Sequence, residues 1–241
     1  MTKHLKDWYD NTLGHCVLNA ESEHLSQALT SIFGFYLLQL GLPQQTAWLE
    51  QSPIRHRFCL HTGHESLGDI QGDFVTLPFQ NDSIDAVVLP HILEFHPHPQ
   101  IILAEAARVL LPEGALLILG FNPWSSFGIK KLLSRSPDLP WQGKFISLYR
   151  LSNWLLDLNL EITVTEKFYT QFPINHTAYL DRFAFLEHWI ARFFPSYGSV
   201  YLVVAKKKVA CITPIGLKQK RHQLLLRPNL AEPTTRNHHR L

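Results

Sequence analysis

The sequence contains few cysteines, and the three present are far apart. Cys16, Cys59 and Cys211 are odd in number and form no C-x-x-C pair. This spacing argues against a disulfide framework and against a zinc knuckle. We therefore expect a protein of a reducing compartment, the cytoplasm, without a structural metal.

Long apolar runs are also missing. No stretch reaches the roughly 18 uncharged apolar residues of a membrane-spanning helix. The N-terminal MTKHLKDWYD carries charges where a secretory signal has an apolar core. The sequence therefore predicts a soluble chain with no transmembrane segment, and its 241 residues suffice for one full-sized core.

Charged residues make up only 17% of the chain, and they are unevenly distributed. Residues 206–241 contain nine Lys or Arg and one acid, whereas residues 1–205 contain thirteen Lys or Arg and nineteen acids. The weak apolar spacing beyond Lys206 predicts a basic, flexible tail. Such a tail could make weak contacts with nucleic acid or an anionic surface through Lys206–Lys208, Lys218, Lys220 and Arg221. A tail that is simply solvated is an equally good explanation.

The middle of the chain alternates between strand and helix patterns. Continuous apolar runs over residues 84–89 and 115–121 predict strands that are covered on both faces. Between them, Pro99 suits the start of a helix that runs to Leu110. Strand, helix and strand with short connections predict a βαβ unit in a parallel sheet.

Weaker patterns predict elements on either side of this unit. The first forty residues have helical spacing and a stop at Gly41-Leu42-Pro43, and residues 57–60 suit a short buried strand. Later we expect a helix with Ser147 as its N-cap, strands over 161–170 and 199–205, and a helix over 179–194. The domains predicted are a helical cap (1–44), a main α/β domain (45–207) and the tail (208–241).

One block of the sequence carries a family resemblance. Its parts, in order, are Gly72 to Phe79 (GDFVTLPF), Asn81 to Val88 (NDSIDAVV), His91 to Phe95 (HILEF) and Glu105 to Gly114 (EAARVLLPEG). The block resembles class I S-adenosylmethionine-dependent methyltransferases of the ubiquinone/menaquinone-biosynthesis type, known as methyltransferase type 11. FNPWS at Phe121 to Ser125 is similar to that family too, and the whole chain resembles a bacterial branch of it.

The resemblance implies a fold, an activity and a cofactor. The fold is the Rossmann-like α/β fold of class I methyltransferases, with a mostly parallel sheet and an antiparallel edge strand. The cofactor is S-adenosylmethionine, and the activity is methyl transfer to an unidentified small or apolar acceptor. A catalytically inactive scaffold that binds RNA or a protein through its basic tail is the alternative. A nicotinamide dehydrogenase is disfavoured because G-x-G-x-x-G is absent.

The same resemblance implies cofactor-binding residues. In relatives, the acid of the G-D pair accepts a hydrogen bond from the adenine amino group and the next backbone N–H meets the ring; Asp73 and Phe74 hold these positions. Leu89 and Pro90 would line the same crevice, beyond the carboxyl end of the next strand. The alternative for Asp73 is a turn carboxylate that binds only backbone.

His91 is the candidate catalytic residue. An unperturbed imidazole titrates near neutral pH, so His91 could face an acceptor as a general base. A loop histidine without a catalytic role is the alternative. We expect Glu94 to orient that loop rather than react.

The resemblance breaks down at the cofactor loop. Relatives carry E/D-x-G-x-G-x-G after the first strand and a ribose-binding acid after the second. With residues 57–60 as the first strand, His61, Thr62 and Gly63 occupy the place of the loop. The eleven residues between Leu60 and Gly72 then leave no room for a second strand. We therefore expect a domain that is shortened in its first half.

Two other clusters suggest ligands less strongly. Cys59 lies close in sequence to three histidines, His56, His61 and His64, but the spacing matches no zinc signature. His96 and His98 suit an exposed turn. Aromatic residues near the end of the main domain could cover an apolar substrate, although core packing explains them equally well: Phe183, Phe185, Trp189, Phe193 and Phe194.

Overall fold

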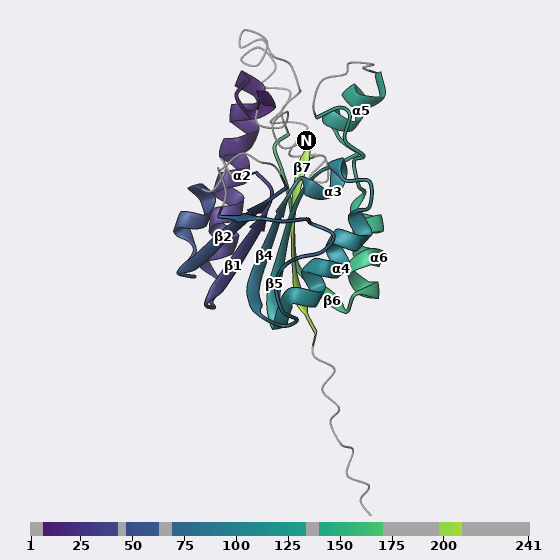
Figure 1. Cartoon of the computed structure of the whole chain (residues 1–241). Coiled ribbons are helices and arrows are strands. Elements are labelled where there is room, and N and C mark those ends of the chain that lie inside the picture. The colour runs from purple at the N-terminus through teal and green to yellow at the C-terminus, as the bar shows by residue number, and fades with distance from the viewer. Residues whose placement is uncertain (1–6, 43–46, 63–68, 134–139, 171–197, 209–241) are drawn as a thin grey trace, which may run out of the picture. The chain divides into compact units, whose positions relative to one another are not determined.

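Seven strands form one sheet with helices on both faces (Figure 1). The computed structural model describes residues 7–42, 47–62, 69–133, 140–170 and 198–208. Its first half contains α2 (Thr12–Thr30), β1 (Tyr36–Leu40), the 3-10 helix η1 (Ala47–Gln51), β2 (His56–His61), β3 (Ile70–Gln71) and β4 (Ile84–Pro90). Its second half contains α3 (Ile92–Phe95), α4 (Pro99–Val109), β5 (Leu110–Phe121), α5 (Ser126–Leu133), α6 (Leu148–Asp157), β6 (Leu160–Phe168) and β7 (Val200–Lys207).

The strand order is β3-β2-β1-β4-β5-β7-β6. The first five strands in this order are mutually parallel, whereas β7 runs antiparallel to both β5 and β6. The order reverses between β1 and β4, which is where open α/β sheets bind their ligands. This topology confirms the predicted Rossmann-like fold. The antiparallel strand lies one place inside the edge, and β6 is the outer strand.

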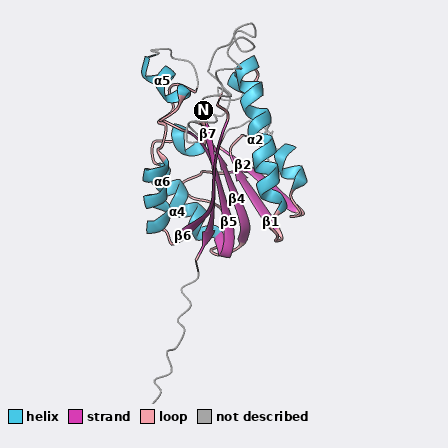
Figure 2. Ribbon diagram, turned by 180° about the vertical axis from the view of Figure 1, so that it is seen from behind, coloured by secondary structure: helices cyan, strands magenta, loops and turns pink. Residues whose placement is uncertain are grey.

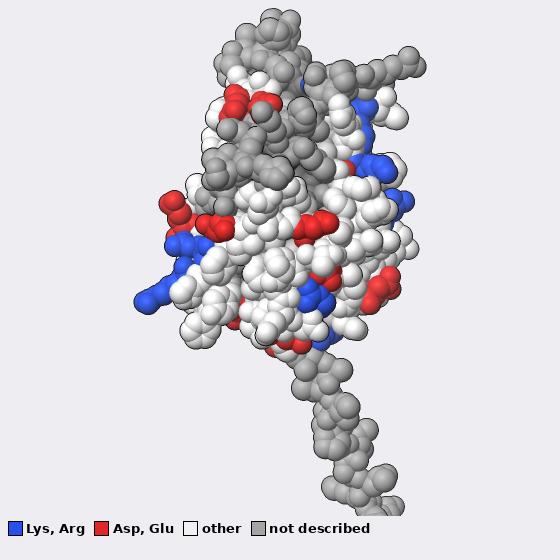
Figure 3. Space-filling view, in the orientation of Figure 1, with Lys and Arg blue, Asp and Glu red and all other residues white. Residues whose placement is uncertain are grey.

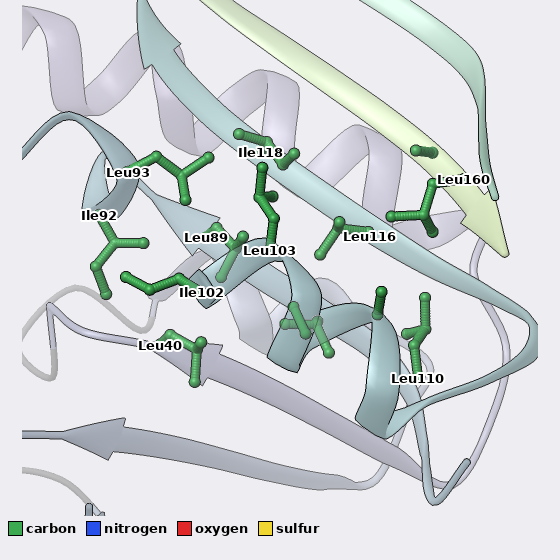
Figure 4. Close-up of a cluster of buried hydrophobic side chains, with 14 of the residues drawn as sticks. Leu40, Leu89, Ile92, Leu93, Ile102, Leu103, Leu110, Leu116, Ile118 and Leu160 are labelled. Carbon is green, nitrogen blue, oxygen red and sulfur yellow. The ribbon is translucent and has the colours of Figure 1, made fainter. Parts of the chain in front are cut away.

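The two faces of the sheet bury two separate cores. Helix α2 and η1 cover one face, and α4 and α6 cover the other (Figure 2). Successive strand residues point to opposite faces, so Val87 packs under α4 while Val88 packs under α2. Figure 4 shows the α4 side, where Leu89, Leu103 and Ile118 interdigitate. Burial on both faces explains why β4 and β5 are continuous apolar runs.

The predictions for the central and final elements are confirmed. The strand over 84–89, the helix from Pro99 and the strand over 115–121 all form, although β5 already begins at Leu110. Ser147 caps α6, where its hydroxyl accepts the Arg150 N–H at 3.4 Å. The two closing strands pair antiparallel. The helix expected over 179–194 and the tail (208–241) lie outside the described residues, apart from Lys208.

The predicted helical cap (1–44) extends too far towards the C-terminus, because its last part is a strand of the sheet. Helix α2 stops at Thr30, and Tyr36–Leu40 is a central strand that pairs with β2 on one side and β4 on the other. Residues 57–60 therefore lie in the second strand of the sheet, not the first. The first half has its full set of three strands; its shortening lies in connections such as that from β1 to β2, where the described part contains only η1.

Several residues of the family-like block hold the fold together. The carboxylate of Asp85 accepts the backbone N–H groups of Phe35 and Tyr36, both at 2.9 Å, and so fixes the start of β1. Glu105 accepts the Leu77 N–H at 2.9 Å, and Arg108 donates to the Leu77 carbonyl at 3.0 Å. These motif residues therefore anchor the strand ends and loops on which the candidate site is built.

Candidate functional site

The candidate site lies where the parallel strands end. Strands β1, β2 and β4 end at Leu40, His61 and Pro90, and β1 lies between the other two. The chain turns sharply directly after β1, because Gly41 has φ +74° and Leu42 has φ 49°. A left-handed conformation is easy for glycine and costly for leucine. This strained turn occupies the place of the glycine-rich loop of relatives.

Two apolar side chains pack beside this turn. A Cβ atom at Gly41 would lie 3.1 Å from Ile92 Cδ1 and 3.7 Å from Phe74 Cζ. Phe74 is buried, and it reaches the turn from the loop after β3. The structure thus places the Phe74 side chain beside the turn at the end of β1. Its contact with a cofactor stays a prediction.

Gln39 connects the turn to η1 through neutral hydrogen bonds. Its Nε2 donates to the carbonyls of Gly41 and Leu42, both at 3.0 Å, and its Oε1 accepts the Trp48 indole N–H at 2.7 Å. The Cys59 thiol donates to the Gly41 carbonyl at 3.5 Å. Both Gln39 and Trp48 are buried. We call these five residues the Gln39 network.

The chemistry of this network explains why residue 39 is an amide. An indole N–H can only donate and a carbonyl can only accept, so the residue between them must do both. Relatives carry an acid two residues before the first glycine of the loop, and Gln39 stands at that place before Gly41. A carboxylate there would face two carbonyl oxygens without a proton to share. The turn after β1 is therefore held by a neutral side chain.

The sequence suggested that His61 and Thr62 take the place of the glycine loop, but the structure places them elsewhere. They follow β2, and the true counterpart of the loop begins at Gly41, after β1. His61 is buried at the end of the second strand, where relatives carry the ribose acid. Gly63 lies outside the described residues. The signal that could have corrected this prediction is Gln39-Leu40-Gly41, which keeps the spacing of D-x-G.

Asp73 and the end of β4 complete the crevice. Asp73 is exposed, and its Oδ1 accepts the Val75 N–H at 3.2 Å, so it serves as a turn carboxylate whether or not it also binds a ligand. Leu89 is fully buried in the core on the α4 side. Pro90 is buried as well. Cofactor contact by these residues stays a prediction.

His91 lies between two buried carboxylates. Its Nε2 is 2.8 Å from Glu21 Oε1 on α2, and its Nδ1 is 2.9 Å from Glu94 Oε2 on α3. Glu21 also accepts the Tyr9 hydroxyl at 2.7 Å, and Glu94 accepts the Phe121 N–H. The His91 side chain and both carboxylates are at most 1% exposed. We call these five residues the His91 network.

This arrangement makes His91 a cation rather than a base. Burial lowers the pKa of His91, but the charge and hydrogen bond of Glu21, together with those of Glu94, outweigh burial and raise it to about 10. A proton on each ring nitrogen lets the imidazole donate to both carboxylates when these are ionised. The imidazole ring is also stacked on the Phe121 ring, and the two ring centroids are 4.1 Å apart. Both ring nitrogens are thus engaged by buried carboxylates, and the role of His91 as a general base stays a prediction that this geometry does not favour.

The weaker metal hypothesis finds no support among the described residues. They contain no group of three His, Cys, Asp or Glu side chains arranged to hold a metal ion. Burial, followed by the charge of Asp69, raises the pKa of Cys59 to about 12, so its thiol stays protonated and is a poor ligand. His56 is exposed beside Tyr36. His64 and the aromatic cluster over 183–194 lie outside the described residues.

Comparisons with known proteins agree with this geometry. A sequence model described as "Methyltransferase domain" matches residues 35–118, from just before β1 to within β5. Uncharacterized protein YafS of Escherichia coli is 28% identical over 91% of this chain and 88% of its own. The ubiquinone/menaquinone biosynthesis C-methyltransferase UbiE of a Ruegeria species is 35% identical over 28% of this chain and 27% of its own.

Among solved structures, a S-adenosylmethionine-dependent methyltransferase from Thermotoga maritima has the same fold. It aligns with a TM-score of 0.59 at 16% identity and covers 84% of this chain and 94% of its own. No helix among the described residues is long and apolar enough to cross a membrane. The chain thus has the class I methyltransferase fold, and the similarity of its residues 35–118 to a methyltransferase domain implies S-adenosylmethionine as the cofactor.

Proposed function

We propose that the protein transfers a methyl group from S-adenosylmethionine to a small or apolar acceptor. The observation that carries the proposal is the adenosine side of the crevice. There, Asp73 keeps an exposed carboxylate and Phe74 packs beside the Gly41 turn. This pairing of an acceptor oxygen with an apolar ring suits an adenine base.

The residues present fit the cofactor in part. Asp73 would accept a hydrogen bond from the adenine amino group, Phe74 would supply an apolar wall, and a ring nitrogen of His61 would replace the ribose carboxylate. When bound, the cofactor supplies a methyl group on a positively charged sulfur, which needs no nucleophile from the protein. The work left to the chain is to position the two reactants and to exclude water.

The His91 network limits the choice of acceptor. Both nitrogens of its imidazole are engaged by carboxylates, so it has no site for a proton from the acceptor. The acceptor atom must therefore be nucleophilic without help from His91. A neutral amine, a thiolate or a stabilised carbanion meets this condition, whereas an unactivated alcohol does not.

Titration calorimetry with S-adenosylhomocysteine tests the proposal. We expect binding in the micromolar range, about −8 kcal/mol, with adenosine and NAD as specificity controls. Asp73→Ala should weaken this binding by at least about tenfold, because a buried ligand donor loses its acceptor. An unchanged affinity would remove Asp73 from the site. No heat up to millimolar ligand, from protein shown to be folded, would refute the proposal.

A scaffold or binding protein is the second candidate, and the Gln39 network favours it. The turn at the end of β1 is satisfied by the chain's own Gln39 and Trp48, so its fold does not require a ligand. In that case the basic tail would be the binding element, for RNA or for a protein partner. A folded protein that ignores S-adenosylhomocysteine and binds RNA in a salt-dependent manner would support this candidate.

A further inference from the structure

Three apolar side chains project from the segment that follows β5. Trp124, Ile129 and Leu132 are 81%, 53% and 86% exposed. Ile129 and Leu132 are three residues apart on α5 and therefore share one side of the helix. Because β5 is parallel to β4, this segment lies at the same end of the sheet as the candidate site (Figure 1). We call these three residues the α5 surface.

The charged side chains that the structure describes in this segment are all cations. The described residues of the segment 121–150 contain Lys130, Lys131, Lys144 and Arg150 and no acid. Figure 3 shows Lys and Arg side chains along this side of the molecule. The Lys130 ammonium lies 4.7 Å from the Trp141 ring centroid, and that of Lys131 lies 4.4 Å from the Phe145 ring centroid. The segment from Trp141 to Phe145 therefore packs against α5.

We propose that the α5 surface binds the headgroup region of an anionic membrane. Tryptophan prefers the boundary between headgroups and acyl chains, where leucine and isoleucine can bury their side chains. Lys144, which is exposed in the segment that packs against α5, would attract anionic lipids. A protein interface of similar size would normally add polar side chains of both signs around an apolar centre. The described residues of the segment 121–150 offer charge of one sign only, which matches an anionic lipid bilayer better.

The binding expected is weak and reversible. Three apolar side chains on a short helix give much less anchorage than a spanning helix, and the electrostatic part is screened by salt. The proposal goes beyond methyl transfer, because a bilayer can bind this surface without a cofactor or an acceptor. It also gives the candidate site a position beside a source of apolar molecules.

Sedimentation of the full chain with lipid vesicles tests this proposal without any methylation assay. We expect binding to vesicles that contain phosphatidylglycerol, and at least about tenfold weaker binding to phosphatidylcholine alone. The double variant Trp124→Ser/Leu132→Ser should lose about tenfold or more in vesicle affinity. Lys144→Glu should also weaken binding, and the loss should be larger at low salt.

The matched control is Phe33→Ser/Phe35→Ser. These side chains are 77% and 73% exposed, and they precede β1 at the opposite end of the sheet. This variant should bind vesicles like the unaltered chain. Unaltered binding by the Trp124/Leu132 variant would overturn the proposal and direct attention to the tail. Equal losses in both double variants, or no binding to anionic vesicles, would overturn it as well. Thermal unfolding of each variant checks that the fold is intact.

Discussion

The two halves of the candidate site are held together by different chemistry. At the end of β1 the Gln39 network is neutral, and at the end of β4 the His91 network contains a cation between two carboxylates. A neutral amide costs little to bury once its hydrogen bonds are made, whereas a buried charge depends on every partner. The first half can therefore change its loop while the fold survives, and the second half cannot easily change.

The largest effect should come from breaking the charged half. His91→Ala would leave Glu21 and Glu94 buried without a cation between them, which typically costs about 3–5 kcal/mol. Urea unfolding at neutral pH measures the loss. The control is His24→Ala, which removes a half-exposed pair with Glu166 at 2.9 Å and should cost only about 1 kcal/mol or less. Similar losses in the two variants would mean that the His91 network contributes no more than a surface pair.

The charged half should also make stability depend on pH. The folded pKa of His91 is raised from 6.5 to about 10, so between these values the folded chain keeps a proton that the unfolded chain releases. The contribution of His91 is therefore complete below about pH 6.5 and is lost as pH rises towards 10. Burial also raises the pKa of Glu94, and this adds a change of the same sign at lower pH.

Urea unfolding across this pH range provides the test. The unaltered chain should lose stability steadily from neutral to alkaline pH, by an amount on the order of several kcal/mol. His91→Ala should show a flatter profile in the alkaline part of this range, because the imidazole proton that only the folded chain retains is no longer present. Parallel profiles for the two proteins would contradict the assignment of the shift to His91.

The same division explains what the sequence could predict. Strands β4 and β5 follow from continuous apolar runs, and helix α4 follows from Pro99 at its start; all three were predicted, although β5 begins at Leu110 and not at residue 115. Tyr36–Leu40 is too short for its period to be read, and only pairing with β2 and β4 makes it a strand. Glu21 and His91 are seventy residues apart, so no local pattern signals their contact. The role of His91 was accordingly missed.

We expect a middle-sized loss of stability when an acid replaces Gln39 in the neutral half. Gln39→Glu would place carboxylate oxygens against the Gly41 and Leu42 carbonyls, which removes two hydrogen bonds and buries a charge. The expected loss is about 2–3 kcal/mol at neutral pH, measured by urea unfolding. Most of it should return at about pH 4, where a carboxyl of raised pKa is protonated and can donate. A fully stable variant at neutral pH would show that the turn rearranges to accept an acid.

The smallest effect should come from the donor on η1. Trp48→Phe keeps an aromatic ring in the core but removes the N–H that Gln39 Oε1 accepts at 2.7 Å, so we expect a loss of about 1–2 kcal/mol. In the Gln39→Met background the same substitution should cost less, since the oxygen left without a donor is no longer present. A double-mutant cycle measures the difference as a coupling energy, expected at about 1 kcal/mol. Additive losses would mean that Trp48 acts by packing alone. A clear coupling would mean that the Trp48 indole orients the Gln39 amide. The conformation of the Gly41 turn, which that amide stabilises, would then depend on η1.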